Sequence, residues 1–478
     1  MRFAITAAVV LGLAGTASAA TFVVPSQGIP NIQTAVNGAS TGDTILIKKG
    51  WYRENVIVNA SGLKFVGRGV TWDGNVLGAD GDALTITGDD TVIQGITFRN
   101  GNYQINVIAG NRTQVMKCSF LDPAQDGVYV DLGNDTVVTG CRFVGVGSDG
   151  AEIYGNGTIL TKNLVQQSGN RGFYLEGDAV RVEGNSFFNL DDSNGVYVLG
   201  NNAVVVKNKA SLVDSDVVRI DGNGALVELN KADRCDSRLA NVAGINATVQ
   251  KNSASYVQGA VFVDGDGAQV LSNKISNCGS SDAISVVGDA VTIRGNSIAT
   301  TWDDADGISV SINTAGGGTI EGNRMTDCAG NGLNLQSDNL VVRSNTCTRC
   351  GQDNRAGISV VGDINNLEAN TSTDADNIGI LVNGNTNTVV RCAVKNALAD
   401  GIKVSAGNNN TFDTCSATGC GGEGFDNRGT NTALTGGSYL KNRFDVANDL
   451  IGGASFTDTT LAGVRFVSGG NAQQPEVD

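Results

Sequence analysis

The chain has 478 residues, no histidine, and 48 acidic against 33 basic residues, which gives a formal net charge of −15. Without histidine the chain cannot form a Ser–His triad, a histidine metal site or an imidazole base. The negative charge disfavours nucleic acid and anionic membranes as partners. It also disfavours acidic polysaccharide, unless a local basic patch or a bound cation intervenes.

Residues 1–20 predict a signal peptide. They contain a basic residue at Arg2, an apolar centre, and small residues at Ala17, Ser18 and Ala19. No later apolar run approaches the ~18 residues that a transmembrane helix needs, so we expect no membrane span. The mature chain is therefore expected to be secreted, periplasmic or held at the cell surface.

Residues 21–80 are expected to form an N-terminal cap and the first coils of the fold. Ile29–Ser40 has a short helical pattern that begins next to Pro30. Three strand-like runs follow it, with glycine-containing turns between them: Ile45–Ile47, Val56–Val58 and Leu63–Val66.

Residues 81–467 repeat a unit of three short strands, seen most clearly in DGVYVDLGNDTVVTGCRF from Asp126 to Phe143. Glycine and asparagine tolerate positive φ and punctuate the strands. The unit recurs about every 23 residues, which is typical of a solenoid. We predict an all-β fold, a single right-handed three-sided parallel β-helix with a short N-terminal capping helix and a flexible tail at 468–478. The predicted repeat starts are Gly127, Gly150, Gly172, Gly195, Val217, Ala240, Ala260, Ala283, Gly307, Gly332, Gly357, Gly379, Gly401 and Gly424.

One asparagine recurs between the second and third strand of successive repeats. Asparagine suits a bend because it accepts left-handed backbone geometry, and amides stacked ~4.8 Å apart can hydrogen-bond along the axis. This column predicts the register of the coils. Its members are Asn163, Asn185, Asn208, Asn230, Asn252, Asn273, Asn296, Asn323, Asn345 and Asn370.

Cysteines extend this column at both ends and form another column elsewhere. The pairs Cys118/Cys141, Cys392/Cys415 and Cys328/Cys350 fall in adjacent coils, at a spacing that a disulfide can bridge. Buried stacked thiols are the alternative, because cysteine packs well as a small hydrophobic residue. Both interpretations remain open at this point.

Two of these features resemble a known group of proteins. The segment IQTAVNGASTGDTILIKKGWYRENVIV resembles the first coil of exported parallel β-helix proteins, and the asparagine column resembles the ladder of pectate-lyase-like β-helices. The chain thus resembles right-handed parallel β-helix repeat proteins of the pectin-lyase-fold superfamily. The resemblance implies an extended solenoid that acts on or binds polysaccharide.

Candidate functional residues gather on the strands of the GVYV type. In a parallel β-helix, equivalent residues stack in rows, and we expect the residue before Gly and the one between the two valines to face outward. Tyr129, Glu152, Tyr174 and Tyr197 are predicted to bind sugar. Arg171, Arg219, Asp126 and Asp149 are candidate catalytic residues, and Asp126 and Asp149 are also candidate Ca²⁺ ligands.

Three functions fit these residues. The first is binding or lyase-like cleavage of an extended, uronate-containing polysaccharide, in which an arginine, lysine or tyrosine serves as the base. The second is a non-enzymatic cell-surface, adhesin or structural role for a rigid, monomeric rod. The third is a degenerate pectinesterase-like activity. CSFLDPAQDGVYV resembles a pectinesterase segment that would assign catalytic roles to Gln125 and Asp126, and Asp149, in SDGAEIYG, falls near that family's second catalytic aspartate.

Overall fold

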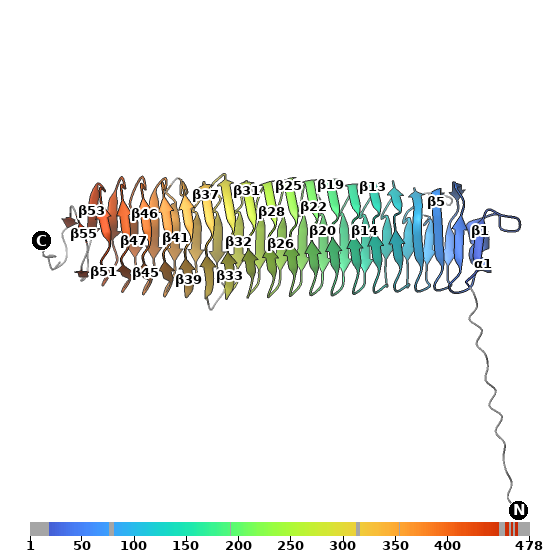
Figure 1. Cartoon of the computed structure of the whole chain (residues 1–478), viewed down its shortest axis with the longest axis horizontal. Coiled ribbons are helices and arrows are strands. Elements are labelled where there is room, and N and C mark those ends of the chain that lie inside the picture. Colours follow the sequence, from blue (N-terminus) through green and yellow to red (C-terminus); the bar gives the residue numbers. More distant parts are fainter. Residues whose placement is uncertain are drawn as a thin grey trace, which may run out of the picture.

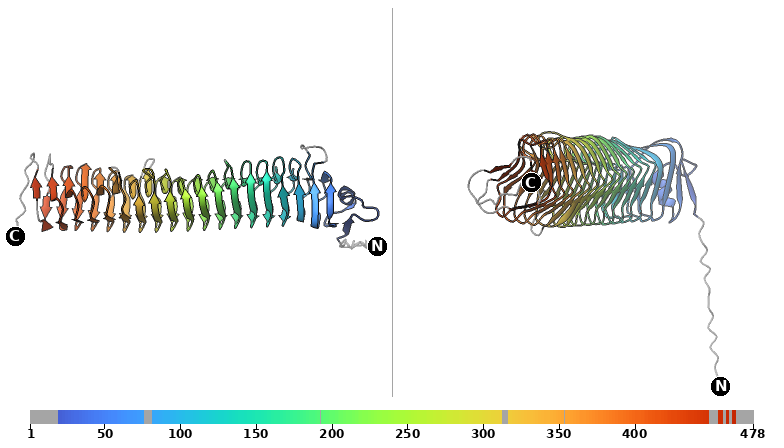
Figure 2. Two further views of the ribbon diagram at one scale, coloured as in Figure 1. Left: turned by 90° about the horizontal axis from the view of Figure 1, so that it is seen from above. Right: turned by 60° about the vertical axis from the view of Figure 1, so that its left-hand side comes forward.

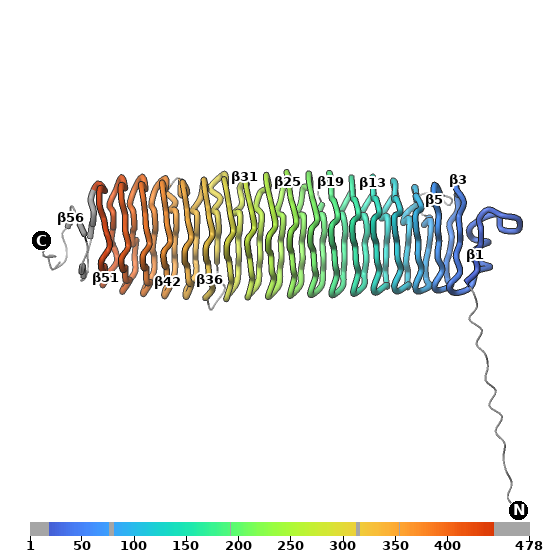
Figure 3. Tube along the Cα trace, viewed as in Figure 1, coloured from blue at the N-terminus to red at the C-terminus, as the bar shows by residue number. Residues whose placement is uncertain are grey.

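The chain forms a long rod of stacked coils (Figures 1 and 3). The computed structural model describes residues 19–75, 81–191, 193–311, 316–352, 354–448 and three short strands within 455–466. In this part of the chain there are 56 strands and one helix, and neighbouring coils pair in parallel. The prediction of an all-β parallel β-helix is confirmed. The predicted signal peptide lies almost entirely, and the predicted C-terminal tail wholly, outside the described residues.

Among the described residues, one face of the rod is a ladder of 19 parallel strands, which we call the front face. Its strands begin next to the predicted repeat starts, with a single slip: Val218 pairs with Ala240, so the repeat there begins at Leu239 and not at Ala240. The front-face strands are β4 Val56–Val58, β6 Leu84–Ile86, β8 Ile105–Val107, β11 Val128–Val130, β14 Ala151–Tyr154, β17 Phe173–Glu176, β20 Val196–Leu199, β23 Val218–Asp221, β26 Ala240–Ala243, β29 Val261–Asp264, β32 Ile284–Val287, β35 Ile308–Ser311, β38 Leu333–Gln336, β41 Ala356–Val361, β44 Ile378–Asn383, β47 Ile402–Ala406, β50 Glu423–Asn427, β53 Phe444–Asn448 and β56 Val464–Phe466.

Two further ladders complete each coil, so that the rod has three sides when it is turned (Figure 2). The second face follows the front face along the chain, and the third face leads back to the front face of the next coil. Strands of the second face include β2 Thr44–Ile47, β12 Val137–Thr139, β15 Ile159–Thr161, β18 Arg181–Glu183 and β21 Val204–Val206. Strands of the third face include β3 Gly50–Arg53, β10 Ser119–Leu121, β13 Arg142–Val146, β16 Leu164–Ser168, β19 Ser186–Leu190, β22 Lys209–Val213 and β25 Lys231–Cys235.

The interior is filled by stacked aliphatic side chains and by a line of aromatic rings. The rings of Phe98, Phe120 and Phe143 are parallel, with centroids 5.5 and 4.8 Å apart. These rings explain the glycine that opens the front-face strands. A Cβ on Gly127 would lie 2.6 Å from the ring of Phe143, and one on Gly172 would lie 2.3 Å from a carbonyl oxygen of the next coil. Close packing, and not the positive φ that we expected, requires glycine at these positions.

The asparagine column is a buried hydrogen-bonded ladder, as predicted. The backbone N–H of Asn185 donates to Oδ1 of Asn208 at 2.8 Å, and Nδ2 of Asn208 donates to the carbonyl oxygen of Val182 at 3.0 Å. The expected left-handed conformation, however, belongs to the residue before each asparagine: Lys162 has φ 56° and Lys207 has φ 57°. The asparagine is needed for its amide, which satisfies backbone groups that the bend removes from the strand ladders.

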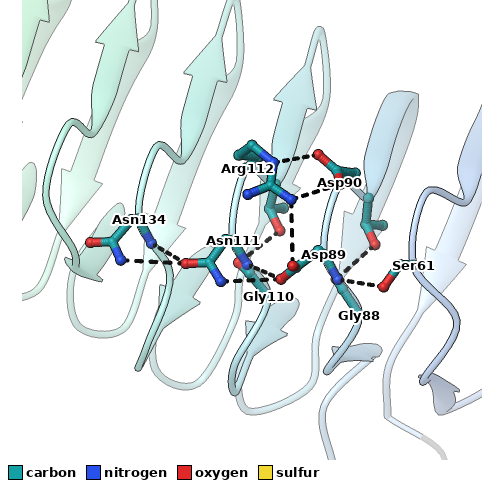
Figure 4. Close-up of polar contacts among 10 residues, drawn as sticks. Ser61, Gly88, Asp89, Asp90, Gly110, Asn111, Arg112 and Asn134 are labelled. Carbon is teal, nitrogen blue, oxygen red and sulfur yellow. Dashed lines mark hydrogen bonds and ion pairs between the residues drawn. The ribbon is translucent and has the colours of Figure 1, made fainter.

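A second polar ladder, absent from the sequence-based prediction, lies at the turn between the front and second faces (Figure 4). The backbone N–H of Asn111 donates to Asp89 at 2.8 Å, and that of Asn134 donates to Asn111 at 3.0 Å. The guanidinium of Arg112 also pairs with Asp90 at 2.6 and 2.8 Å across adjacent coils. Side chains therefore bridge the coils at this corner as well.

The helix α1, Ile32–Gly38, covers the start of the rod, as the sequence predicts. Asn31 accepts a hydrogen bond from the N–H of Thr34 at the helix N-terminus, and Glu54 accepts bonds from the N–H groups of Ile32 and Gln33. The side-chain amide of Gln33 pairs with both backbone groups of Ile57 and so imitates the strand that would precede β4. This protects an otherwise open sheet edge.

All ten cysteines are buried free thiols, which is the second of the two alternatives left open by their spacing.

Within the described ranges, no helix is long and apolar enough to cross a membrane.

Candidate carbohydrate-binding face

Parallel pairing brings the predicted sugar-binding residues into one row on the front face. Tyr129 pairs with Glu152, Glu152 with Tyr174, Tyr174 with Tyr197, and Tyr197 with Arg219, each in the adjacent strand. Each strand buries its flanking apolar residues and leaves the residue between them partly or fully exposed. The structure therefore places these five predicted residues side by side on the outer surface.

Two further tyrosines join this row and were missed from the sequence. Centroid distances along the line Tyr103, Tyr129, Tyr154, Tyr174 and Tyr197 are 4.6, 6.2, 5.9 and 5.5 Å. Tyr154 could have been found, because it lies two residues after Glu152 and so faces the same side of the strand. Tyr103 precedes β8, and only its stacking on the ring of Tyr129 identifies it. We call these five residues the tyrosine row.

Two arginines lie over the rings of the tyrosine row. The guanidinium carbon of Arg171 is 4.3 Å from the ring centroid of Tyr174, and that of Arg219 is 4.8 Å from the centroid of Tyr197. Each guanidinium also has a carboxylate partner, at 3.6 Å from Asp149 and at 3.3 Å from Asp221. The arginines are thus held as cations, which does not suit a catalytic base.

The two predicted carboxylates do not face outward, which corrects the prediction. Asp126 and Asp149 are each only 1% exposed. The reason is a third ladder: the N–H of Asp149 donates to Asp126 at 2.7 Å, and the N–H of Arg171 donates to Asp149 at 2.6 Å. The same bond recurs far from the tyrosine row, where the N–H of Asn331 donates to Asp306 at 2.6 Å. An aspartate before the front strand therefore has a structural role in every coil that contains it.

Asp126 and Asp149 nevertheless form a tight group with Glu152. One carboxylate oxygen from each of the three lies within 4.8 Å of the others. The pKa of Asp126 is raised to about 7, mainly by burial and in part by the neighbouring carboxylates, against a backbone hydrogen bond that lowers it. Burial also raises the pKa of Asp149 to about 6, although Arg171 opposes the shift. The group offers the oxygen ligands that Ca²⁺ prefers.

The tyrosine hydroxyls are engaged with carboxylates. The hydroxyl of Tyr154 donates to Glu152 at 2.5 Å, that of Tyr174 to Glu176 at 3.4 Å, and that of Tyr197 to Asp221 at 2.6 Å. Burial, assisted by these carboxylates, raises the pKa of Tyr154, Tyr174 and Tyr197 above the ordinary value. A tyrosine with a raised pKa stays protonated at neutral pH, so the row is a set of hydrogen-bond donors and not of bases.

An open hollow of about 440 Å³ adjoins the tyrosine row where the front strands turn toward the second face. Tyr154, Glu176 and Asp131 line it together with the turn residues Asn134 and Leu132. The Leu132 side chain is 67% exposed. The hollow thus combines an apolar contact with carboxylate and amide groups, a mixture that suits the hydroxyl groups and C–H faces of a sugar.

Comparison with known sequences gives one family. A family model described as "Right handed beta helix region" matches residues 45–187, 238–371 and 283–444, together more than half of the chain. No curated protein matches the chain.

Several solved structures are similar to this chain at low sequence identity. An alginate lyase from Paenibacillus sp. str. FPU-7 is 15% identical, with a TM-score of 0.43, over 49% of this chain and 95% of that chain. The A-module of mannuronan C-5 epimerase AlgE4 from Azotobacter vinelandii is 16% identical, with a TM-score of 0.44, over 66% and 96%. The surface protein and adhesin PfbA from Streptococcus pneumoniae is 10% identical, with a TM-score of 0.41, over 61% and 93%.

Proposed function

Because this chain belongs to the right-handed β-helix family, whose coils display side chains in straight rows, we propose that it binds an extended polysaccharide along the tyrosine row. One observation carries the proposal: five tyrosine rings follow one another on adjacent coils, with successive centroids no more than 6.2 Å apart. A linear polymer can follow this row over several coils.

The charges around the row favour a polysaccharide whose bound segment is neutral. Both arginines already have carboxylate partners, while Asp131, Glu152 and Glu176 lie beside the rings or line the hollow. Sugar hydroxyls can accept from the arginines, and can donate to these carboxylates and to the tyrosine hydroxyl oxygens. A uronate at the same place would meet more negative than positive charge. The charges therefore favour a neutral segment over the uronate-containing polysaccharide that the sequence led us to expect.

The same geometry favours binding over catalysis. The proposed bases Arg171 and Arg219 are stabilised as cations, and Asp126 and Asp149 are engaged by backbone N–H groups. A bound Ca²⁺ at Asp126, Asp149 and Glu152 is a second candidate, supported by their 4.8 Å cluster. There the protein would supply three carboxylates, and Ca²⁺ would neutralise them and polarise a sugar oxygen. The signal-peptide pattern supports action outside the cytoplasm.

The test is titration of neutral and acidic oligosaccharides into wild type and into a Tyr174→Ala/Tyr197→Ala variant, with and without Ca²⁺. The variant should bind a neutral oligosaccharide at least about tenfold more weakly, because each lost aromatic contact contributes about 1 kcal/mol. Phe188→Ala, an exposed ring on the third face, is the matched control and should bind like wild type.

Equal affinity in wild type and in the double tyrosine variant would place the site elsewhere. If neither protein bound any oligosaccharide, a purely structural or adhesive role would replace this proposal. Affinity that depends on Ca²⁺ and is lost in Glu152→Gln, with the tyrosines intact, would support the second candidate. Appearance of unsaturated uronate absorbance during the titration would show lyase activity and overturn the preference for binding.

A further inference from the structure

A second surface of the rod, on the corner where the second and third faces meet, has the opposite electrostatic character. Two rows of exposed residues flank the asparagine ladder there. The basic members of the first row are Lys117, Lys162, Lys207, Lys251 and Arg391, and those of the second row are Arg142, Lys209, Lys231, Lys274 and Arg324. From Lys117 to Ser416 neither row contains an aspartate or glutamate. We call these ten residues the basic ridge.

The ridge is unexpected in a chain with a net charge of −15. Part of its first row is neutralised from the adjacent strand, since Lys207 pairs with Glu183 and Lys251 with Glu228, each at 2.8 Å. The second row has no such relief. Among the residues that the structure describes, Arg142, Lys209, Lys231, Lys274 and Arg324 make no ion pair.

Lys209 and Lys231 show most clearly that this arrangement is electrostatically unfavourable for the folded chain. They are direct register partners on the adjacent parallel strands β22 and β25, so their Cα atoms lie about 4.8 Å apart. Like charges directly opposite each other destabilise a sheet. Lys274 lies in the same row two coils further on, after Ser253. A row of unpaired cations at intervals of one to three coils is complementary to a linear polymer that carries repeated negative charges.

We propose that the basic ridge binds an acidic polysaccharide, with one carboxylate or sulfate per sugar unit or pair of units, laid along the rod axis. Two features favour such a polymer over nucleic acid. Duplex DNA carries one charge per about 1.7 Å, much denser than the ridge, and would meet repulsion from the acidic remainder of the protein. Binding of single strands normally uses aromatic stacking, and the two rows contain no aromatic residue.

The ridge is separate from the tyrosine row. The corner between the second and third faces is the one that does not adjoin the front face, so a polymer on the ridge would not touch the tyrosines. The inference therefore does not rest on the proposed function, and the two can fail independently. If both hold, the rod joins a neutral polymer on one side to an acidic polymer on the other.

The experiment measures binding of polygalacturonate oligomers to the full chain in the presence of a chelator, at low and at physiological ionic strength. The triple variant Lys209→Gln/Lys231→Gln/Lys274→Gln should bind about tenfold more weakly than wild type and with a shallower salt dependence. The charge-conserving triple Lys→Arg variant at these positions should retain binding. The matched control, Lys49→Gln/Lys64→Gln/Lys395→Gln, removes the same charge from exposed lysines off the ridge and should also retain it.

Three results would overturn the proposal. The first is absence of polygalacturonate binding by wild type. The second is equal loss in the ridge variant and in the off-ridge control, which would reduce the effect to net charge. The third is tighter binding of single- or double-stranded DNA than of polygalacturonate through the same lysines. Unchanged polygalacturonate binding in Tyr174→Ala/Tyr197→Ala would confirm that the two surfaces are separate, and a parallel loss would place the acidic polymer on the front face instead.

Discussion

Asp126 shows how one buried side chain couples the candidate site to the stability of the fold. Its pKa is raised to about 7 by burial, while an unfolded aspartate has a pKa near the ordinary value of 3.8. Between about pH 4 and pH 7, Asp126 is therefore protonated in the folded chain and ionised in the unfolded chain. The contribution of Asp126 to the free energy of unfolding is fully present below the pKa of the unfolded state. It is lost as the pH rises through the pKa of the folded state.

We predict that Asp126→Asn flattens the pH dependence of stability over this range. The amide keeps an oxygen that can accept from the N–H of Asp149 but cannot ionise. Wild type should lose up to a few kcal/mol relative to the variant as pH rises from about 4 to about 8. Thermal melting of both proteins across this range is the measurement, with Asp131→Asn on an exposed turn as control. A wild-type slope retained in Asp126→Asn would show that other groups control the dependence.

At the level of single residues, the sequence predicted the orientation of Tyr129 but not that of Asp126. The alternation of Val128, Tyr129 and Val130 correctly assigns the outward tyrosine, because strand alternation is a local property. The orientation of Asp126 depends on the next coil, whose backbone N–H it accepts. Nothing in its own strand reveals that contact, so the sequence placed Asp126 on the surface when it is buried.

At the level of the elements, the asparagine ladder links successive coils through buried side-chain amides. Asn208 accepts from Asn185, donates to Val182, and donates to Asn230. We predict that Asn208→Leu destabilises the protein by about 1–3 kcal/mol, because it leaves the buried N–H of Asn185 and the carbonyl of Val182 unsatisfied. Chemical denaturation measures this. Asn366→Leu, at an exposed position on the second face, should change the free energy of unfolding by less than about 0.5 kcal/mol.

The whole molecule was more predictable than its parts, because its architecture is one local pattern repeated many times. The period, the asparagine column and the capping helix were all readable from the sequence, and each repeat supplied an independent check of the others. The second polar ladder at Asp89, Asn111 and Asn134 was not recognised, since asparagine and aspartate alternate there and resemble ordinary turn residues. The basic ridge was hidden for a related reason: its lysines are dispersed along the chain and meet only when the coils stack.

Stacking also predicts the behaviour of a shortened chain. Truncation after Ala299 removes the coils that pair with the preceding strands on all three faces, and should leave three open parallel edges. We expect the fragment to aggregate, and light scattering during refolding would detect this. The control is the full chain refolded at the same concentration. A monomeric, soluble fragment would show that a coil tolerates an uncovered edge.

The asparagine ladder and the ladder at Asp89, Asn111 and Asn134 donate their hydrogen bonds in opposite directions along the rod axis. Loss of one side chain should therefore affect the preceding coil in one ladder and the following coil in the other. In the asparagine ladder the N–H of one coil donates to the side chain of the following coil, as Asn163 does to Asn185. At the second ladder the N–H of one coil donates to the preceding coil, as Asn111 does to Asp89. A lesion at Asn208 should therefore accelerate amide hydrogen exchange first in the coil on its N-terminal side. A lesion at Asn134 should do so first on its C-terminal side, at Asn156.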